Sequence, residues 1–354
     1  VGLVSGNQPI LPIDQDTLDP IYFSYRIAQP FATPTAQFTL DPWYRWDAGW
    51  YVSIALGQQD GVSGFAPLYP ALIRLVTPFA LGNPLLAALL ISSACFLIAL
   101  WLLFDYVQNL LDVETAKLTV LLLVLFPFSI FFASAYSESL FLCLTLALFI
   151  SVKRERWFWV GAYSLLAILT KFSGVTLVIP LGWETVNAFL QDKQSKWLAL
   201  SSTAVIPVTA LVYLGGMRII RPSSSRFVQT FSWPWDSIMV FWRKFQMSSL
   251  WALDWVNLLL LIICLLSIFY MIKKFPPVIW LYASSSIAIL LLIQVNGDFL
   301  IFGLTRYVLV IFPFFVVWAN WLLPRRWIKP FVLTGSVFAQ MGVAWLYTRW
   351  YFVG

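Results

Sequence analysis

The sequence alternates long apolar runs with short polar connections from about residue 84 to its end. Because a helix needs about 20 apolar residues to cross the hydrocarbon core of a bilayer, each run predicts one membrane-spanning helix. The runs lie at residues 84–106, 116–134, 138–152, 157–170, 174–190, 197–216, 251–272, 278–295, 304–323 and 328–348. This pattern predicts an all-α polytopic membrane protein with about ten spans.

The composition supports this fold class. Of the 354 residues, 60% are hydrophobic and 11% are charged, a balance that a water-soluble protein of this length does not carry. Histidine, the commonest general base and metal ligand, is absent, and the cysteines lack metal-ligand spacing. They fall inside the predicted spans, where they serve as small apolar packing residues: Cys95, Cys143 and Cys264. We therefore expect no metal and no cofactor, and acid–base chemistry by carboxylates, lysine or tyrosine.

Lysine and arginine gather in four short connections at alternate span ends. Such clusters mark the cytoplasmic side of a membrane protein: residues 153–156, 192–196, 273–274 and 325–329. The extracytoplasmic side then receives residues 1–83, 134–138, 170–174, 217–250, 296–303 and the C-terminal tail. An extracytoplasmic start leads us to expect a further span before Val1, and about 10–11 spans in all.

This topology divides the chain into two parts. Residues 1–83 form an extracytoplasmic N-terminal segment, and residues 84–354 form a transmembrane bundle with an external loop at 217–250. Arginine and lysine retained on the external side indicate an anionic ligand, although lipid headgroups would attract the same charges. A basic surface placed there by membrane helices excludes nucleic acid as a partner.

Residues 41–57 have the features of a short helix. Asp41 is its expected N-cap, Pro42 its first helical position, and Gly57 lies just beyond its end. Its aromatic side chains are of the kind that rests at the headgroup level of a bilayer, which predicts an interfacial helix carrying the catalytic loop: Trp43, Trp46, Trp50 and Tyr51.

Asp47 lies within one helical turn of several of these rings, so its carboxylate is expected to project from an aromatic surface. Partial desolvation there favours a general base. The alternative is that Asp47 caps the helix or pairs locally with Arg45 or Arg74. The next stretch, residues 64–70, is broken by prolines as it enters the membrane. Irregular backbone at that depth lies inside protein or beside a wet cavity, so this stretch is a candidate wall of a site.

Six short elements combine aromatic, ionisable and glycine residues at the external side: Arg45-Trp46-Asp47-Ala48-Gly49-Trp50-Tyr51, Phe65-Ala66-Pro67-Leu68-Tyr69-Pro70 with Arg74, Tyr136-Ser137-Glu138, Thr170-Lys171-Phe172-Ser173-Gly174, Trp233-Pro234-Trp235 and Thr305-Arg306-Tyr307. In this order they resemble the signature of the GPI mannosyltransferase II (phosphatidylinositol-glycan class V) family and its bacterial-type homologues. Lys171 departs from the family, which usually has arginine there; lysine keeps the charge but loses bidentate phosphate geometry.

The resemblance implies a transmembrane helix bundle of the GT-C glycosyltransferase superfamily with extracytoplasmic juxtamembrane helices. It implies an inverting enzyme that moves mannose from a polyprenyl or dolichyl phosphate donor to a hydroxyl of a glycan or glycolipid acceptor. By this resemblance Asp47 is the candidate catalytic base, and the candidate ligands of the donor phosphate are Arg306, Lys171 and Arg74. The candidate sugar- or acceptor-binding residues are Arg45, Trp46, Trp50, Tyr51, Tyr69, Glu138, Trp233, Trp235 and Tyr307.

Several of these residues have a second interpretation. Glu138, at the mouth of a span, could bind sugar hydroxyls, orient Lys171 or Arg306, or form a salt bridge that locks two helices together. Lys171 and Arg306 could instead extend toward lipid headgroups. Loop 217–250 could be an interfacial helix pair.

The main alternative function is a polytopic lipid or sugar transporter or flippase, and a non-catalytic subunit that holds a lipid is another. Paired repeats are not evident and the middle positions of the spans are nearly free of charge, which disfavours a transport path. We expect a multi-pass protein of a bacterial plasma membrane, because the loops are short, or of the endoplasmic reticulum if the source is eukaryotic. Membrane lipids are expected partners, and the acceptor stays open.

Overall fold

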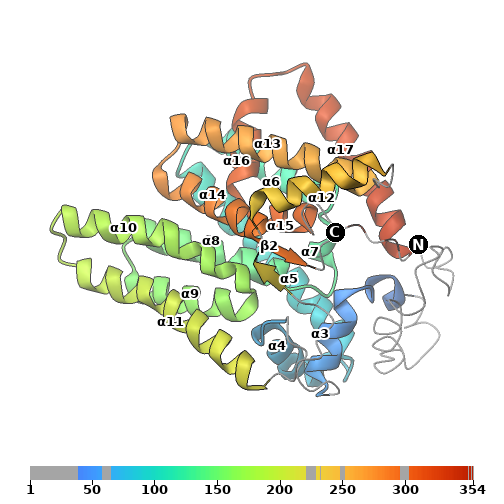
Figure 1. The fold of residues 1–354 in the computed structure, drawn as a ribbon, viewed down its shortest axis with the longest axis horizontal. Coiled ribbons are helices and arrows are strands. Elements are labelled where there is room, and N and C mark those ends of the chain that lie inside the picture. Colours follow the sequence, from blue (N-terminus) through green and yellow to red (C-terminus); the bar gives the residue numbers. More distant parts are fainter. Residues whose placement is uncertain are drawn as a thin grey trace.

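The computed structural model describes residues 39–57, 65–220, 229–231, 233–247, 252–295, 303–349, 351 and 353. Most of the predicted N-terminal segment and part of loop 217–250 lie outside these residues. The described chain is almost entirely helical (Figure 1). The exception is a short antiparallel ladder in which β1 (Gln229–Phe231) pairs with β2 (Ile293–Val295). Apart from this ladder, the predicted all-α fold is confirmed.

The N-terminal part of the described chain forms η2 (Asp41–Trp43), α3 (Asp47–Ala55), α4 (Leu68–Val76) and η3 (Thr77–Phe79). The first half of the bundle comprises α5 (Pro84–Gln108), α6 (Val113–Val124), α7 (Ile130–Ala133), α8 (Glu138–Lys153), α9 (Trp157–Thr170), η4 (Phe172–Leu177), α10 (Val178–Leu190) and α11 (Lys196–Ile220). The second half comprises α12 (Pro234–Gln246), α13 (Ala252–Lys274), α14 (Pro277–Leu292), α15 (Leu304–Val310), α16 (Pro313–Leu322) and α17 (Ile328–Thr348).

Each predicted apolar run contains a helix, but two of the runs are broken. Residues 116–134 form α6 and α7, and residues 304–323 form α15 and α16, which are bent by 83°. Pro127 and Pro313 lie at these breaks. Proline interrupts a helix because it lacks an amide hydrogen and disfavours helical conformation of the preceding residue. By length and composition, three described helices can cross a membrane, α5, α13 and α17, or four if the bent pair is one span.

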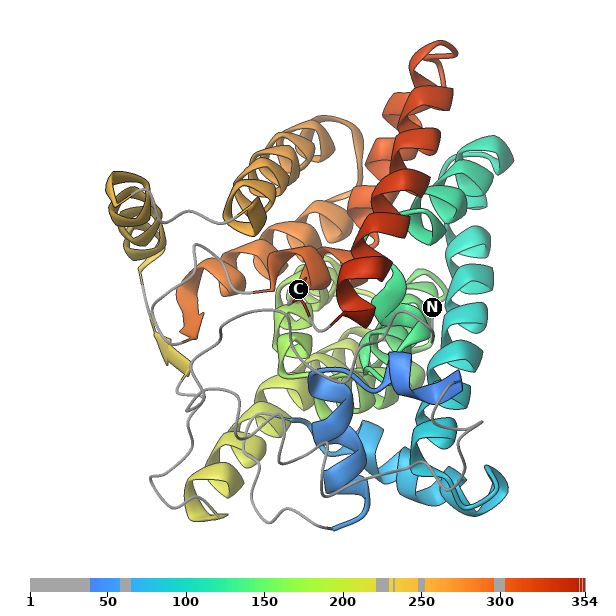
Figure 2. The same ribbon diagram turned by 90° about the vertical axis from the view of Figure 1, so that its right-hand side faces the viewer.

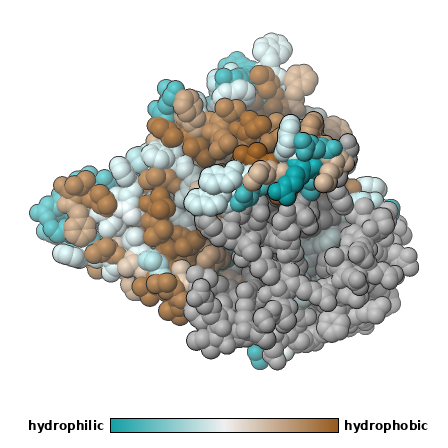
Figure 3. Space-filling view, in the orientation of Figure 1, coloured by the Kyte–Doolittle hydropathy of each residue, from teal (hydrophilic) through white to brown (hydrophobic). Residues whose placement is uncertain are grey.

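The outer surface of the bundle carries apolar side chains suited to lipid contact. Figure 3 shows hydrophobic residues over α13 and over the side formed by α9, α10 and α11. Leu266 on α13 is 65% exposed, and Trp101 on α5 is 68% exposed. Apolar surface on this scale marks contact with a membrane or a partner. Together with the long apolar helices, it identifies an integral membrane protein.

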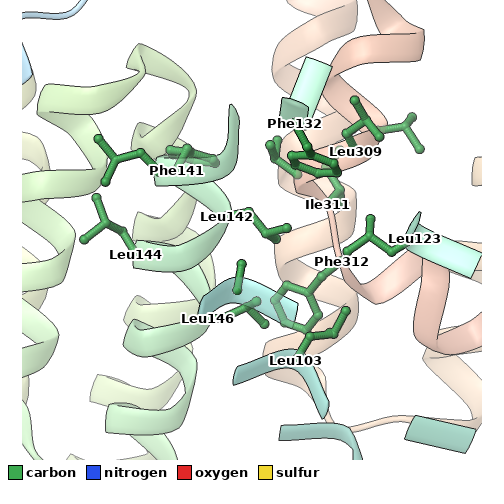
Figure 4. Packing of buried hydrophobic residues seen from close by; sticks show 14 of the residues in the cluster. Leu103, Leu123, Phe132, Phe141, Leu142, Leu144, Leu146, Leu309, Ile311 and Phe312 are labelled. Carbon is green, nitrogen blue, oxygen red and sulfur yellow. The ribbon is translucent and has the colours of Figure 1, made fainter. Parts of the chain in front are cut away.

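The buried core lies where α5, α6, α8 and the bend between α15 and α16 meet. α8 packs on α5 and α9, while α15 contacts α8 and α13. Figure 4 shows Leu103, Leu142, Leu146 and Phe312 packed together at this junction, and each is fully buried. Because cores of this kind are close-packed, the junction fixes α15 relative to α8.

The helices that precede α5 lie against one end of this bundle. Figure 2 shows α3 and α4 near the start of α5, and α3 contacts both α4 and α5. Figure 1 shows α17 at one edge of the molecule, and α17 contacts α7. Side-chain contacts bring the starts of three helices to one region: α3 is bonded to the residue before α8 and to α15, and α15 contacts α8.

Candidate active site

The capping pattern predicts a single helix over residues 41–57, but this prediction is wrong. The segment forms η2 and α3, which are separated by residues 44–46, and α3 begins at Asp47 itself. Trp46, directly before α3, has a φ of 54°, a conformation that bulky side chains rarely adopt. The expected terminal glycine is confirmed, since Gly57 follows α3 with a φ of 68°.

The hydroxyl of Tyr136 bridges the backbone on both sides of Trp46. It donates to the carbonyl oxygen of Arg45 at 3.2 Å and accepts the backbone N–H of Asp47 at 3.2 Å. Tyr136 is buried and lies just before α8. The unusual turn is therefore held by a distant part of the chain, which places the first residue of α3 beside the start of α8.

Four ionisable side chains, three from helices and one from the connection between α9 and η4, meet beside this turn. Nη1 of Arg306, on α15, lies 2.5 Å from Oδ2 of Asp47, and Nε of Arg306 lies 3.0 Å from Oε1 of Glu138. Nζ of Lys171 lies 2.8 Å from the same Oε1. We call these four residues the charge cluster. Asp47 thus has an ion-pair partner 259 positions away, which neither local alternative anticipated.

Burial changes steeply across the charge cluster. The side chain of Glu138 is 1% exposed, Lys171 10%, Arg306 15% and Asp47 28%. Glu138 is therefore the inner anchor and Asp47 the outer edge. Within the described residues, Oε2 of Glu138 is buried without a hydrogen-bond partner, and Nε of Arg306 pairs with Oε1 by charge rather than by a directed hydrogen bond. Buried polar atoms in this condition are uncommon and frequently mark functional sites.

Two glycines position the cations. Gly303 has a φ of 73° and precedes α15, where its carbonyl oxygen accepts the backbone N–H of Arg306 at 3.0 Å, so Arg306 lies in the first turn. Gly174 follows the end of α9, and a Cβ there would lie 3.0 Å from the backbone nitrogen of Ile168. A Cβ so close to another backbone would require the two segments to move apart, so glycine at position 174 allows the turn carrying Lys171 to pack closely on the end of α9.

Aromatic rings surround both cations. Nζ of Lys171 lies 4.3 Å from the ring centre of Tyr307. Cζ of Arg306 lies 5.5 Å from the ring centre of Tyr136 and 5.8 Å from that of Tyr307. Contacts of this kind attract a cation to the ring face. They also keep the cations from extending freely to lipid headgroups.

Tyr51 lies next to the start of α8, where its hydroxyl shares a 2.8 Å hydrogen bond with Oγ of Ser137. Burial first, and then the charges of Glu138 and Asp47, raise the pKa of the Tyr51 hydroxyl well above its usual value. At neutral pH this group is therefore protonated and remains a hydrogen-bond donor beside the two carboxylates.

Two of the predicted ligand-binding arginines are placed elsewhere. Arg45 is 1% exposed, and its Nε and Nη2 donate to the carbonyl oxygen of Thr348 at 3.4 and 3.3 Å. It thereby ties the first segment to the end of α17, where a cation complements the terminal carbonyls. Arg74 is exposed in the last turn of α4, and it forms no ion pair with another described residue.

The remaining aromatic candidates differ in their surroundings. Tyr69 is buried, and its hydroxyl donates to the carbonyl oxygen of Ala88 at 3.1 Å and bonds Oγ of Ser92 at 2.7 Å. The rings of Tyr51 and Tyr69 meet edge to face at 4.9 Å. Trp46 and Trp50 are partly buried. Burial thus gives Tyr69 a clear packing role beneath α3.

Trp233 and Trp235 stand at the start of α12. Their rings stack at 4.9 Å with planes 5° apart, and they are 52% and 54% exposed. The backbone N–H of Trp233 donates to Oδ2 of Asp236 at 2.8 Å, which caps the helix. Lys244 near the other end of α12 pairs with Asp254 of α13 at 3.4 Å. Loop 217–250 therefore contains an amphipathic helix that is tied to the bundle.

Sequence reasoning missed several residues near the charge cluster. The sequence by itself assigns no role to Tyr136, although its place two residues before Glu138 is a signal that could have indicated one. Tyr307 also lines a small cavity together with aliphatic and aromatic side chains. Four hydroxyl-bearing residues line the same cavity, and no sequence motif marks them as a group: Ser173, Thr176, Tyr282 and Ser286.

The carboxylates of the charge cluster are neutralised by protein cations. Within the described ranges, no three His, Cys, Asp or Glu side chains form a group that could hold a metal ion. Two aspartates with the spacing of an Asp-x-Asp metal-binding motif, Asp14 and Asp16, lie outside the described residues.

Comparisons with known proteins give one family and one solved structure. No curated protein sequence matches the chain significantly. The crystal structure of ArnT from Cupriavidus metallidurans, bound to undecaprenyl phosphate, is similar with a TM-score of 0.49 and 15% identity, covering 88% of this chain and 62% of that chain. A family model described as mannosyltransferase (PIG-V) matches residues 25–201, which contain Asp47, Glu138 and Lys171. Because this match spans half of the 354 residues, the chain belongs to the mannosyltransferase (PIG-V) family.

Proposed function

We propose that the chain is an inverting membrane glycosyltransferase that moves a sugar, with mannose expected, from a polyprenyl or dolichyl phosphate to an acceptor hydroxyl. The observation that carries this proposal is the charge cluster. It combines one partly exposed carboxylate with two largely buried cations, which are the two kinds of group that this transfer requires. Membership of a mannosyltransferase family supports mannose as the transferred sugar.

The reaction assigns a separate task to each side of the charge cluster. Asp47 takes the proton of the acceptor hydroxyl while the hydroxyl oxygen forms a bond to the anomeric carbon. The bond from that carbon to the phosphate oxygen breaks, and its electron pair leaves with the lipid phosphate. Arg306 and Lys171 then stabilise the added negative charge through charge-assisted hydrogen bonds. Attack from the face opposite the leaving phosphate inverts the anomeric configuration.

Neighbouring aromatic residues would hold the sugar. Trp46 and Trp50 are partly buried beside Asp47 along the chain, and rings of this type stack on apolar sugar faces. Trp233 and Trp235 form a half-exposed stacked pair that is suited to covering a bound lipid-linked sugar or the acceptor. Arg74, which is exposed on α4, would meet the phosphate only at the mouth of the site.

The site would face the extracytoplasmic side of the membrane. Lysine and arginine concentrate at residues 153–156, 192–196, 273–274 and 325–329, and such clusters stay in the cytoplasm. α8 begins at Glu138 and ends at Lys153, so its start lies opposite to one of these clusters. A bacterial plasma membrane, or the endoplasmic reticulum in a eukaryote, would supply the lipid phosphate donor.

The test is transfer of radiolabelled mannose from polyprenyl phosphate mannose to a lipid extract in reconstituted vesicles. Asp47→Asn should reduce transfer by at least about a hundredfold, since a positioned base contributes roughly 10²–10⁴-fold. The matched control is Asp105→Asn, because the Asp105 side chain is 27% exposed, close to the 28% of Asp47, and also pairs with an arginine, Arg154, at 3.5 Å.

Transfer by the wild type that survives in Asp105→Asn and disappears in Asp47→Asn supports the proposal. If the wild type transfers no mannose, or if Asp47→Asn transfers it at the normal rate, the proposed base and reaction are wrong. Movement of the lipid across the bilayer without transfer would identify a transporter instead.

A further inference from the structure

We propose that Asp47 and the donor phosphate compete for the same arginine, so that Arg306 passes from Asp47 to the phosphate when the donor binds and the base is released only then. This inference rests on the proposed function and adds a binding order to it: donor first, acceptor second.

The contacts of Arg306 lead to this competition. Nη1 is bound to Asp47, and Nε lies against Glu138, so two edges of the guanidinium are already occupied by carboxylates. Arginine binds phosphate best through two parallel N–H groups. A lipid phosphate therefore gains a full arginine contact only if one carboxylate gives up its place.

Burial decides which carboxylate yields. Glu138 is 1% exposed and is held by Lys171 as well as by Arg306. Removing it from these partners would leave charges buried without compensation, which is strongly unfavourable. Asp47 is 28% exposed, so water can replace the arginine at its carboxylate. Glu138 therefore acts as a positioning residue that holds Arg306 while the other contact changes.

Charge balance gives the exchange a chemical purpose. The resting charge cluster holds two carboxylates and two cations, so it offers an anion no net positive charge. In this resting state Oδ2 of Asp47 is occupied by Nη1 of Arg306, so this oxygen is not open to the proton of an acceptor hydroxyl. When Asp47 accepts the acceptor proton, the leaving phosphate gains one negative charge, and Arg306 is then best placed on the phosphate. Without donor, the lock keeps Asp47 from activating water or an acceptor.

The test is equilibrium binding of polyprenyl phosphate, without sugar, to the purified full chain in detergent. Asp47→Asn abolishes the competition, so we expect this variant to bind polyprenyl phosphate about fivefold more tightly than the wild type, the effect of losing one partly exposed ion pair. Asp105→Asn should bind like the wild type.

A double-mutant cycle separates the exchange from simple relief of charge repulsion. In the Arg306→Gln background, Asp47→Asn should no longer tighten binding, because the arginine that it releases is missing. Thermal unfolding of each variant shows that the fold is kept, and only folded variants enter the cycle.

The inference is overturned if Asp47→Asn binds polyprenyl phosphate no more tightly than the wild type, which would show that Nη2 accommodates the phosphate beside Asp47. It is equally overturned if the tightening persists without Arg306. These outcomes differ from failure of the proposed function, in which the wild type neither binds polyprenyl phosphate nor transfers mannose.

Discussion

The two ends of α8 show two kinds of ion pair. At its start, Glu138 pairs with Lys171 at 2.8 Å, and the side chains are 1% and 10% exposed. Just beyond its end, Arg154 pairs with Asp105 at 3.5 Å, and the side chains are 53% and 27% exposed. Exposed pairs contribute about 0–1 kcal/mol, whereas a buried charge that loses its partner is strongly destabilising. The end of α8 can therefore change with little effect, but its start cannot.

The largest expected effect comes from removing the buried charge. Glu138→Gln leaves Lys171 and Arg306 without their shared anion, so we expect the free energy of unfolding to fall by about 3 kcal/mol and transfer to be lost. The control is Glu155→Gln, two residues beyond the other end of α8, whose 48% exposed side chain pairs with Lys193. It should cost less than about 1 kcal/mol. Unfolding in detergent, followed by tryptophan fluorescence, compares the two; equal losses would contradict the contrast.

A smaller effect is expected where the backbone carries a cation of the charge cluster. Gly174→Ala places a Cβ within 3.0 Å of the Ile168 backbone, so the turn after α9 must shift and move Lys171. We expect a loss of about 2 kcal/mol in stability and about a tenfold drop in transfer. Gly182→Ala is the control, because a Cβ there meets nothing within 4 Å. The free energy of unfolding and kcat are measured for both variants. If Gly174→Ala changes neither quantity, the turn has room for a Cβ and the prediction is wrong.

The smallest effect concerns the turn that precedes Asp47. Tyr136→Phe removes the hydroxyl that bonds the Arg45 carbonyl and the Asp47 N–H, so we expect a loss of about 1 kcal/mol. Because Asp47 is then less well held, kcat should fall several-fold while donor binding stays normal. The control is Tyr163→Phe, because Tyr163 is a partly buried tyrosine on α9. It should change neither the free energy of unfolding nor kcat. A fall in donor affinity alone would assign Tyr136 to phosphate binding instead.

Hydropathy was sufficient to predict the helical membrane fold, because the apolar run length that a bilayer requires is a local property of the chain. It could not show that the runs at 116–134 and 304–323 are broken, since their prolines lie inside otherwise continuous apolar sequence. It also could not show that 41–57 divides before Asp47. A φ of 54° at Trp46 is locally unfavourable, and the hydroxyl of Tyr136 stabilises it from a distant part of the chain.

Sequence motifs were sufficient to predict four site residues individually, because ionisable residues at span ends are costly and are rare in an apolar sequence: Asp47, Glu138, Lys171 and Arg306. Only the tertiary structure decided that they form one charge cluster and that Arg306 lies between two carboxylates. The same is true of Arg45, whose motif resembles a binding site but whose guanidinium is buried on the Thr348 carbonyl. The cost of burying a charge is readable from sequence, but the partner that offsets it is chosen by how the helices pack.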